Sequence, residues 1–316
     1  MQKNQHEITV SVFLTSAQRI DQYLTDLFPY SRQQIKTMIK GGQVRLNGND
    51  VKPSQLVSLY DRIEILIFDV PLKVKPQVEF SNMAIRSNDI VIPVIYNDDD
   101  LLIINKPFGL VVHDAPTVDD FSLVDYVKAA NIPLFSDETG RPGIVHRLDQ
   151  FTEGLMILAK SASAFFSIRQ QFKDRQIEKK YYAVLQGVPR SKAAIIDRPI
   201  GRDSKIRARQ SCNNYIDGTE KSAITKYKVL RQFTNITVVD VLLVTGRTHQ
   251  IRVHFSTMNC PVLGDFLYSK QSKKNEGYYL QSYYLKLQHP TKDEPLVVEL
   301  PISQRLKKYA GDNADA

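Results

Sequence analysis

Residues 144–160 read IVHRLDQFTEGLMILAK. Two apolar runs that are typical of β-strands enclose a polar centre, His146-Arg147-Leu148-Asp149. In an extended chain Arg147 and Asp149 face the same way, and a nearby cation favours the ionised form of a carboxylate. Most loop aspartates are caps or turn formers, yet functional side chains are often carried by loops. The stretch therefore predicts a sheet with Asp149 at its end, either as a turn former or as a reactive group.

The chain around this stretch is rich in strand-like runs and poor in long helices. The helical periodicity is clearest near 162–176 and at 248–258. Because helices and strands do not alternate regularly, the pattern favours an α+β fold over a doubly wound sheet. The polar, arginine-rich segment 198–222 is expected to form an exposed loop. The runs that predict strands are 101–105, 155–159, 181–187, 223–230 and 236–244.

A smaller unit precedes the strand-rich part. TSAQRIDQYLTDLF predicts a short helix with Ser16 as its N-cap, and YSRQQIKTMIKGG predicts a second helix that begins at Ser31 and ends before a glycine pair. QVRLNGNDV and DRIEILI add strands, the first with an Asn-Gly turn. Arg32, Lys36 and Lys40 recur every four residues and share one side of the second helix.

The pattern breaks up after Asp69, where prolines and short polar stretches indicate a linker. The predicted boundaries are therefore residues 1–70 for a small domain, 71–90 for a linker and 91–310 for a large domain.

Positive charge is concentrated in one part of the chain. The whole chain has a formal charge of +8, while residues 160–252 contain 19 Lys or Arg and 7 Asp or Glu, a balance of 19 − 7 = +12. This field suggests a polyanionic partner, although a solvated basic face gives the same count. No apolar run has the length of a membrane span, the N-terminus lacks the apolar core of a secretory signal, and there are two cysteines. We expect a cytoplasmic protein, and a monomer because no apolar surface stripe is left over.

Three further segments carry candidate functional residues. TGRTHQIRVHF (245–255) places Arg247 before a helix and Arg252 outside its apolar stripe, as a surface arginine or as a cation that faces a carboxylate elsewhere. KKYYAVLQG places Tyr181 and Tyr182 on alternate faces of a strand, so that one points to the core and the other toward a cleft. Lys106 is a further cation at the end of a strand.

The sequence contains no Walker-type loop and no GxGxxG, HExxH or GxSxG motif. His249 and His254 are five residues apart, which is a poor spacing for two metal ligands on one helix face. The acidic run Asp98–Asp100, taken with the histidines, leaves a metal-dependent nuclease as one alternative, but such a run is also typical of a solvated turn. We expect no metal site.

Taken in order, the motifs resemble those of the RluA-type RNA pseudouridine synthases. NDDDLLIINKPFGLVVH, GIVHRLDQFTEGLMILAK, KKYYAVLQG, EKSAITKYKVL and TGRTHQIRVHFSTMNCPVLGDFLYS are similar to successive blocks of that family, over roughly residues 90–300. QRIDQYLTDLFPYSRQQIKTMIKGGQVRLNG resembles the small αL-type RNA-binding module first seen in a small-subunit ribosomal protein. The pairing is most similar to the RluD branch, which acts on large-subunit ribosomal RNA.

The resemblance implies a fold and a set of site residues. The expected fold is α+β: a small N-terminal αL-type RNA-binding domain, then a catalytic domain with a mixed, mainly antiparallel β-sheet. Asp149 matches the catalytic aspartate, Tyr181 the active-site tyrosine that packs against the target base, and Arg252 the basic residue that pairs with the aspartate. Arg147 matches the arginine that helps to extrude the base. Together with the basic residues noted above, the expected RNA-binding set is Arg147, Arg32, Lys36, Lys40, Lys106 and Arg247.

The implied reaction is the isomerisation of specific uridines to pseudouridine in structured RNA, without a cofactor and with large-subunit (23S) ribosomal RNA as the expected substrate. Two alternatives stay open: a synthase that acts on transfer RNA, and a non-catalytic RNA-binding or ribosome-assembly protein on the same scaffold. The chain departs from the family pattern at Phe151, which is unusual there, and at Glu153, where a small hydroxyl residue usually stands before Gly-Leu. These departures affect the local electrostatic potential and the fit of the RNA, whereas Asp149 still matches the family motif.

Overall fold

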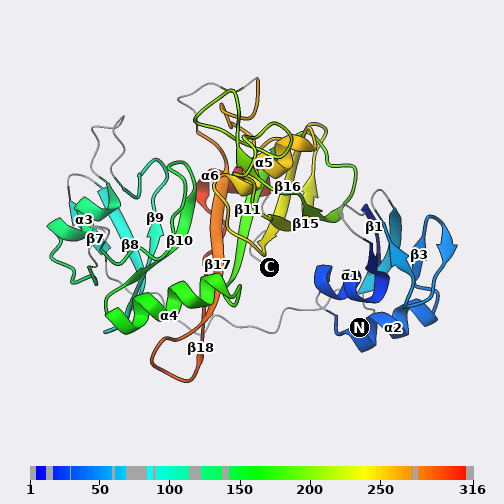
Figure 1. Ribbon diagram of the computed structural model, residues 1–316, viewed down its shortest axis with the longest axis horizontal. Helices are drawn as coiled ribbons and strands as arrows, with labels where there is room; N and C mark the ends of the chain where they lie inside the picture. The colour runs from blue at the N-terminus through cyan, green and yellow to red at the C-terminus, as the bar shows by residue number, and fades with distance from the viewer. Residues whose placement is uncertain are drawn as a thin grey trace. The chain divides into compact units, whose positions relative to one another are not determined.

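The computed structural model describes residues 5–11, 17–28, 30–58, 61–68, 84–87, 90–113, 122–136, 142–270, 272 and 277–310. The chain divides into two compact units, each made of two segments. The first unit comprises Met1–Val74 and Leu185–Pro261, and the second comprises Lys75–Val184 and Val262–Ala316. Figure 1 labels the helices and many of the strands of both units.

The N-terminal part of the first unit contains two short helices and a small sheet. Helix α1 covers Ile20–Leu27 and helix α2 covers Arg32–Lys40, with strands β2 (Gln18–Arg19), β3 (Val44–Leu46), β4 (Asn49–Asp50), β5 (Leu56–Val57) and β6 (Arg62–Phe68) around them. Ser31 caps α2 in a capping box with Gln34, and the helix ends at Gly41, as predicted. The N-cap of α1 is Arg19, whereas the predicted cap Ser16 lies outside the described residues.

The sheet of the first unit continues from the N-terminal part into the second segment of that unit. The strand order is β4-β3-β6-β1-β12-β15-β16, where β1 is Gln5–Ser11, β12 Ala193–Asp197, β15 Ile224–Gln232 and β16 Ile236–Leu243. Strand β1 runs antiparallel to β6 and parallel to β12. Side chains of α1 and α2 share one apolar core with Ala193 and Ile195 of β12, so the small helices are not an independent hydrophobic unit.

Helix α5, Gln250–Thr257, follows β16 in the first unit. The segment predicted as an exposed loop, 198–222, contains two short strands, β13 (Gly201–Arg202) and β14 (Gln210–Ser211), which pair with each other.

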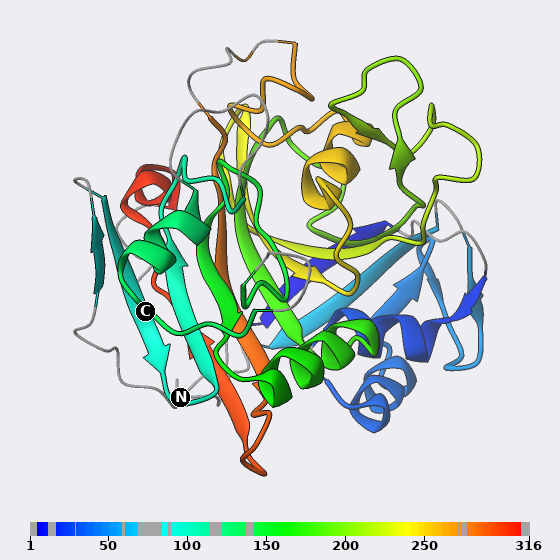
Figure 2. The same ribbon diagram turned by 60° about the vertical axis from the view of Figure 1, so that its left-hand side comes forward.

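The second unit is built on the sheet β11-β17-β10-β9-β8-β7, with β18 beside β17. Only the pairing of β10 with β17 is parallel among the strand pairs described in this unit, because β7–β8, β8–β9, β9–β10, β11–β17 and β17–β18 are antiparallel. Figure 2 shows these strands with helix α4 lying across them. The bounds are β7 Ala84–Ser87, β8 Ile90–Asn97, β9 Leu101–Lys106, β10 Glu153–Ala159, β11 Glu178–Gln186, β17 Leu280–Gln288, β18 Pro295–Glu299, α3 Leu123–Ala129, α4 Ala162–Lys173 and α6 Gln304–Ala310.

Strands β9 and β10 are buried on both faces, which explains their continuous apolar sequence. On one face Leu155 and Ile157 share a core with Phe165 and Ile168 of α4. Met156 and Leu158 point to the opposite face and are also 0% exposed. Asp149 lies a few residues before β10, so the segment that carries it is attached to the best-buried strand pair of the unit.

The expected α+β architecture, with a mixed and mainly antiparallel sheet, is confirmed. The predicted strands correspond to β9, β10, β11, β15 and β16, and the predicted helices to α1, α2, α4 and α5. Within the predicted linker, residues 84–87 belong to strand β7 and Ile90 begins strand β8, and the linker boundaries 71–90 stay a prediction. The boundaries 1–70 and 91–310 stay predictions. Within the described residues, none of the helices combines the length and the apolar character needed to span a bilayer.

Gly154 is the position of β10 that tolerates a side chain least. It has a φ of +111°, and a Cβ atom built there would lie 2.1 Å from the carbonyl oxygen of Ser282 on β17. We expect Gly154→Ala to lower the free energy of unfolding by at least about 2 kcal/mol, because the backbone conformation and the strand contact are both strained. Urea unfolding measures the effect. The control is Gly109→Ala, where φ is +83° but no atom lies within 4 Å, so only the conformational cost of about 1 kcal/mol applies. Equal losses in the two variants would contradict the packing argument.

Candidate active site

Asp149 lies in a turn that leads into β10. The backbone N–H of Thr152 donates to the carbonyl of Asp149 at 3.0 Å, and the neighbouring Leu148 is buried and anchors the segment. The Asp149 carboxylate is half-buried and accepts a hydrogen bond from the hydroxyl of Tyr278 at 3.3 Å. A carboxylate in this position is held in place and is only partly covered, which suits a reactive group.

Tyr278 is a site residue that the sequence analysis missed. Its side chain is 1% exposed, and its hydroxyl also lies 3.4 Å from the hydroxyl of Thr152. Its ring meets Phe151 edge-on, with the centroids 5.8 Å apart. Tyr278 lies 129 residues after Asp149 in the chain, so no local pattern joined the two. A Gly-aromatic pair, Gly277-Tyr278, was the one available signal.

Lys106 is buried instead of exposed at the end of β9. Its side chain is 0% exposed, and its ammonium group donates to the carbonyls of Pro107, Leu110 and Gln150 at 2.9, 2.8 and 3.0 Å. Burial lowers the pKa of Lys106 to about 7, and the negative charges of Asp149 and Glu153 offset part of this shift. The predicted RNA contact of Lys106 is not supported by this placement, because a fully buried ammonium has no surface to offer a phosphate.

Tyr181 lies on β11, in the same unit as Asp149. A register shift follows Lys180, and the Tyr181 side chain is 6% exposed. Burial raises the pKa of Tyr181 to about 12, and the negative charge of Asp149 acts in the same direction. The phenol is therefore neutral at physiological pH. Tyr182 points to the other face, where its ring stacks on Tyr283 at 3.8 Å, as the alternation of the strand predicts.

The two unusual residues after Asp149 have structural partners in the second unit. Phe151 packs against Phe108 and Tyr278 and forms part of the aromatic wall beside the carboxylate. Glu153 accepts a hydrogen bond from Ser303 at 2.9 Å and pairs with Arg305 of α6 at 3.5 Å. Burial raises the pKa of Glu153. The extra acid therefore connects β10 to the C-terminal helix.

In the first unit, Arg252 lies on α5 and is 4% exposed. The alternative of a surface arginine is wrong, because α5 is enclosed on its polar side as well. Its pairing with Asp149 stays a prediction, since the two residues belong to different units.

A buried polar network holds the start of α5. The Gln250 side-chain oxygen accepts from the hydroxyl of Thr245 and the N–H of Arg247, and its nitrogen donates to the carbonyl of Ile224 and the hydroxyl of Thr225. All four hydrogen-bonding positions of this amide are therefore used. His249, the N-cap of α5, has a φ of 58°, a left-handed conformation that is uncommon outside glycine. Neither Gln250 nor this conformation was identified from the sequence.

His254 connects α5 to the arginine-rich segment. It is 0% exposed, its Nε2 donates to the carbonyl of Arg198 at 3.0 Å, and its Nδ1 accepts from the hydroxyl of Thr225 at 2.8 Å. Burial lowers the pKa of His254 to about 4, so the ring is neutral at physiological pH.

The remaining predicted residues are exposed or partly exposed. Arg147 is exposed, next to the segment that carries Asp149, and Arg247 is half-buried before α5. On α2, Lys40 is exposed and Lys36 is half-buried, while Arg32 also serves the fold through an ion pair of 3.0 Å with the buried Asp21. These placements are compatible with RNA contacts, which stay predictions.

The acidic residues of the nuclease alternative are turn formers. Asp98 accepts from Tyr96 at 2.7 Å and from the backbone N–H groups of Asp100 and Leu101, and it pairs with His289 and Lys292. These partners hold the pKa of Asp98 well below its usual range, against the effect of burial. Among the described residues, no group of three or more His, Cys, Asp or Glu side chains is arranged to hold a metal ion.

Comparison with known proteins identifies two regions of the chain. Residues 100–257 match the family model described as RNA pseudouridylate synthase, and residues 18–63 match the S4 domain. The chain is 36% identical to an uncharacterized RNA pseudouridine synthase of Aquifex aeolicus, over 92% of each chain. It is 33% identical to the ribosomal large subunit pseudouridine synthase D of Pasteurella multocida, over 90% of this chain and 88% of that protein. The solved structure of human RNA pseudouridylate synthase domain containing 4 is 26% identical, with a TM-score of 0.53 over 67% of this chain and 89% of that chain.

The neutral state of His254 predicts a pH dependence of stability. The folded-state pKa of about 4 lies below the ordinary value of 6.5, so the unfolded chain binds the proton first as the pH falls. The contribution of His254 is therefore complete above pH 6.5 and is lost progressively between pH 6.5 and 4. Urea unfolding measures the free energy of unfolding across this range. As the pH falls, this free energy should decrease less steeply for His254→Gln than for the wild type. The difference in slope should correspond to the uptake of up to one proton on unfolding. Parallel slopes would contradict the neutral assignment.

Proposed function

Because the chain belongs to the RNA pseudouridylate synthase family, we propose that it isomerises specific uridines of large-subunit ribosomal RNA to pseudouridine, with Asp149 as the reacting carboxylate. The observation that carries the proposal is the half-buried Asp149, hydrogen-bonded to Tyr278 and fixed beside the buried cation of Lys106. The ribosomal substrate is supported by the relatives named for the large ribosomal subunit and by the S4 domain at residues 18–63.

The reaction matches the side chains of this site. The N1–C1′ bond of the uridine breaks, the uracil turns, a C5–C1′ bond forms, and the C5 proton leaves while N1 gains one. One carboxylate serves such a reaction as a nucleophile at C1′ or at C6, or as a base toward a ribose proton. Tyr278 donates to the carboxylate and favours its ionised form, and Lys106 does the same in its protonated state.

The target base has to leave its stack before it reaches Asp149, at a cost of a few kcal/mol. Tyr181 is a neutral aromatic side chain in the same unit and suits the role of the surface that packs against the base. Arg147 is exposed beside the catalytic segment and suits the role of the residue that fills the vacated place. Cytoplasmic location, a monomeric state and the pairing of Arg252 with Asp149 belong to this proposal. No specific observation favours the alternatives of a transfer RNA substrate or of a non-catalytic assembly protein.

The first test is Asp149→Asn, which keeps the size of the side chain and the acceptor for Tyr278 but removes the ionised carboxylate. With large-subunit ribosomal RNA transcribed in vitro from [5-³H]uridine, the wild type should release tritium as the C5 proton leaves. The variant should lose this release by about a thousandfold or more, while its RNA dissociation constant stays within about twofold. Thermal unfolding checks that the variant is folded. Wild-type release by Asp149→Asn would remove Asp149 from the proposed role.

The second test concerns the basic side of α2. The double variant Lys36→Ala, Lys40→Ala is compared with the wild type by plotting the logarithm of the RNA-binding constant against the logarithm of the salt concentration. The magnitude of the slope should fall by about 1.4–1.8, because each lost phosphate contact lowers it by roughly 0.7–0.9. Substitution is preferable to removal of residues 1–70, because α1 and α2 share their core with β12. Gln33→Ala, an exposed neutral position on α2, is the matched control. An unchanged slope in the double variant would exclude this face from the RNA contact.

A further inference from the structure

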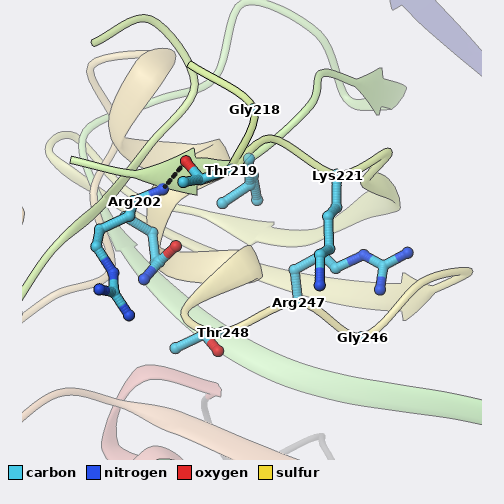
Figure 3. Close-up of a pocket in the computed structure, with 9 residues that line it drawn as sticks. Arg202, Gly218, Thr219, Lys221, Gly246, Arg247 and Thr248 are labelled. Carbon is cyan, nitrogen blue, oxygen red and sulfur yellow. Dashed lines mark hydrogen bonds between the residues drawn. The ribbon is translucent and has the colours of Figure 1, made fainter. Parts of the chain in front are cut away.

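The first unit contains a basic pocket that is distinct from the residues around Asp149. It has a volume of about 660 Å³, within the usual range for ligand sites. Three of its lining residues are cations, and none is a carboxylate. Figure 3 shows Arg202 on one side and Lys221 with Arg247 on the other. The lining residues are Ile200, Arg202, Gln210, Gly218, Thr219, Lys221, Gly246, Arg247 and Thr248.

Hydrogen bonds join the segments that carry the three cations. The hydroxyl of Thr219 accepts from the N–H of Arg202 at 3.0 Å, as drawn in Figure 3, and donates to the carbonyl of Ile216 at 2.6 Å. Ile200 and Lys221 exchange two backbone hydrogen bonds of 3.0 and 2.9 Å. Arg247 donates from Nε to the carbonyl of Ser222 at 2.9 Å. The pocket therefore exists before any ligand binds, so little ordering cost accompanies binding.

The positive charge of the pocket is not neutralised by its own segment. In the described part of the chain, Arg202 and Lys221 are exposed and neither takes part in an ion pair. The bond from Nε of Arg247 leaves its two terminal nitrogens as the donors that face outward. Asp203, the nearest acid to Arg202 in sequence, is buried and accepts from the backbone N–H groups of Lys205 and Ile206.

We propose that this pocket binds a backbone phosphate, with its ribose, of the substrate RNA. The inference rests on the proposed function and names a second contact region for the same substrate. Three cations and the Thr248 hydroxyl supply donors for phosphate and ribose oxygens, whereas no aromatic side chain lines the pocket to stack a base. Gly246-Arg247-Thr248 leads directly into α5, which carries Arg252, so the pocket and the predicted catalytic arginine are joined by one short rigid segment.

The contact is tested by the salt dependence of RNA binding with the full chain. The probe is large-subunit ribosomal RNA transcribed in vitro, and its dissociation constant is measured by filter binding between 50 mM and 200 mM salt. Arg202→Ala and Lys221→Ala should each weaken binding about fivefold to tenfold at about 0.1 M salt, and each should lower the salt slope by about 0.7–0.9. Both side chains are exposed, so folding should be unaffected.

Two matched variants show whether the position matters or only the charge. Lys221→Arg keeps the cation and should keep the wild-type slope. Lys228→Ala removes an exposed lysine of β15 that does not line the pocket, and it shows how much any cation of this unit contributes. The inference is overturned if the salt slopes of Arg202→Ala and Lys221→Ala equal the salt slope of Lys228→Ala.

The two proposals can fail separately. If the wild type forms pseudouridine in the transcript but the pocket variants keep their slopes, the pocket is wrong and the function stands. If the slopes fall as expected but no pseudouridine forms, the pocket binds RNA and the proposed reaction is wrong. If the pocket binds a free anion instead, millimolar inorganic phosphate should raise the thermal unfolding temperature of the wild type. This rise should be lost in Lys221→Glu, and the salt slopes of RNA binding should not change in the pocket variants. That result also overturns the inference.

Discussion

The buried ammonium of Lys106 is the constraint on which the geometry around Asp149 depends. A charged group without solvent is costly unless it is fully hydrogen-bonded, and this one uses its three N–H bonds on three backbone carbonyls. Two of these carbonyls belong to the turn after β9, and the third belongs to Gln150, the residue next to Asp149. Because β9 and β10 pair along their length, Lys106 ties the segment that carries Asp149 to the best-buried part of the sheet. When Lys106 is protonated, its charge also favours the ionised form of Asp149.

The first unit uses buried polar side chains in a comparable way. Gln250 and His254 of α5 saturate their hydrogen-bonding capacity on β15, on the turn before α5 and on Arg198. Satisfied networks of this kind are rigid, because each member left unpaired would cost free energy. They hold the arginine-rich segment and the start of α5 in fixed positions, although neither is part of a long regular element. The fixed backbone positions of Arg202, Lys221 and Arg247 follow from this network and from the hydrogen bonds between their segments.

Local patterns predicted much of the fold, while contacts between distant residues could not be predicted. The apolar runs of β9 and β10 and the capping box of α2 are visible in sequence because each is determined by neighbouring residues. The role of Tyr278 was missed because its contact with Asp149 spans 129 residues, and the burial of Lys106 and Arg252 was missed because an isolated cation at a strand end or on a helix is usually exposed. The motif match predicts Asp149 and Tyr181 as site residues, and these roles stay predictions. It did not show that Glu153 is held by Arg305 and Ser303.

The central claim is that this chain forms pseudouridine in large-subunit ribosomal RNA through Asp149. The most direct measurement is a map of carbodiimide adducts by primer extension on RNA from cells that lack the gene, with either the wild type or Asp149→Asn re-expressed. The account predicts that defined sites in large-subunit ribosomal RNA disappear and return only with the wild type. Sites that disappear in transfer RNA alone would contradict the substrate, and restoration of the ribosomal sites by Asp149→Asn would contradict the role of the carboxylate.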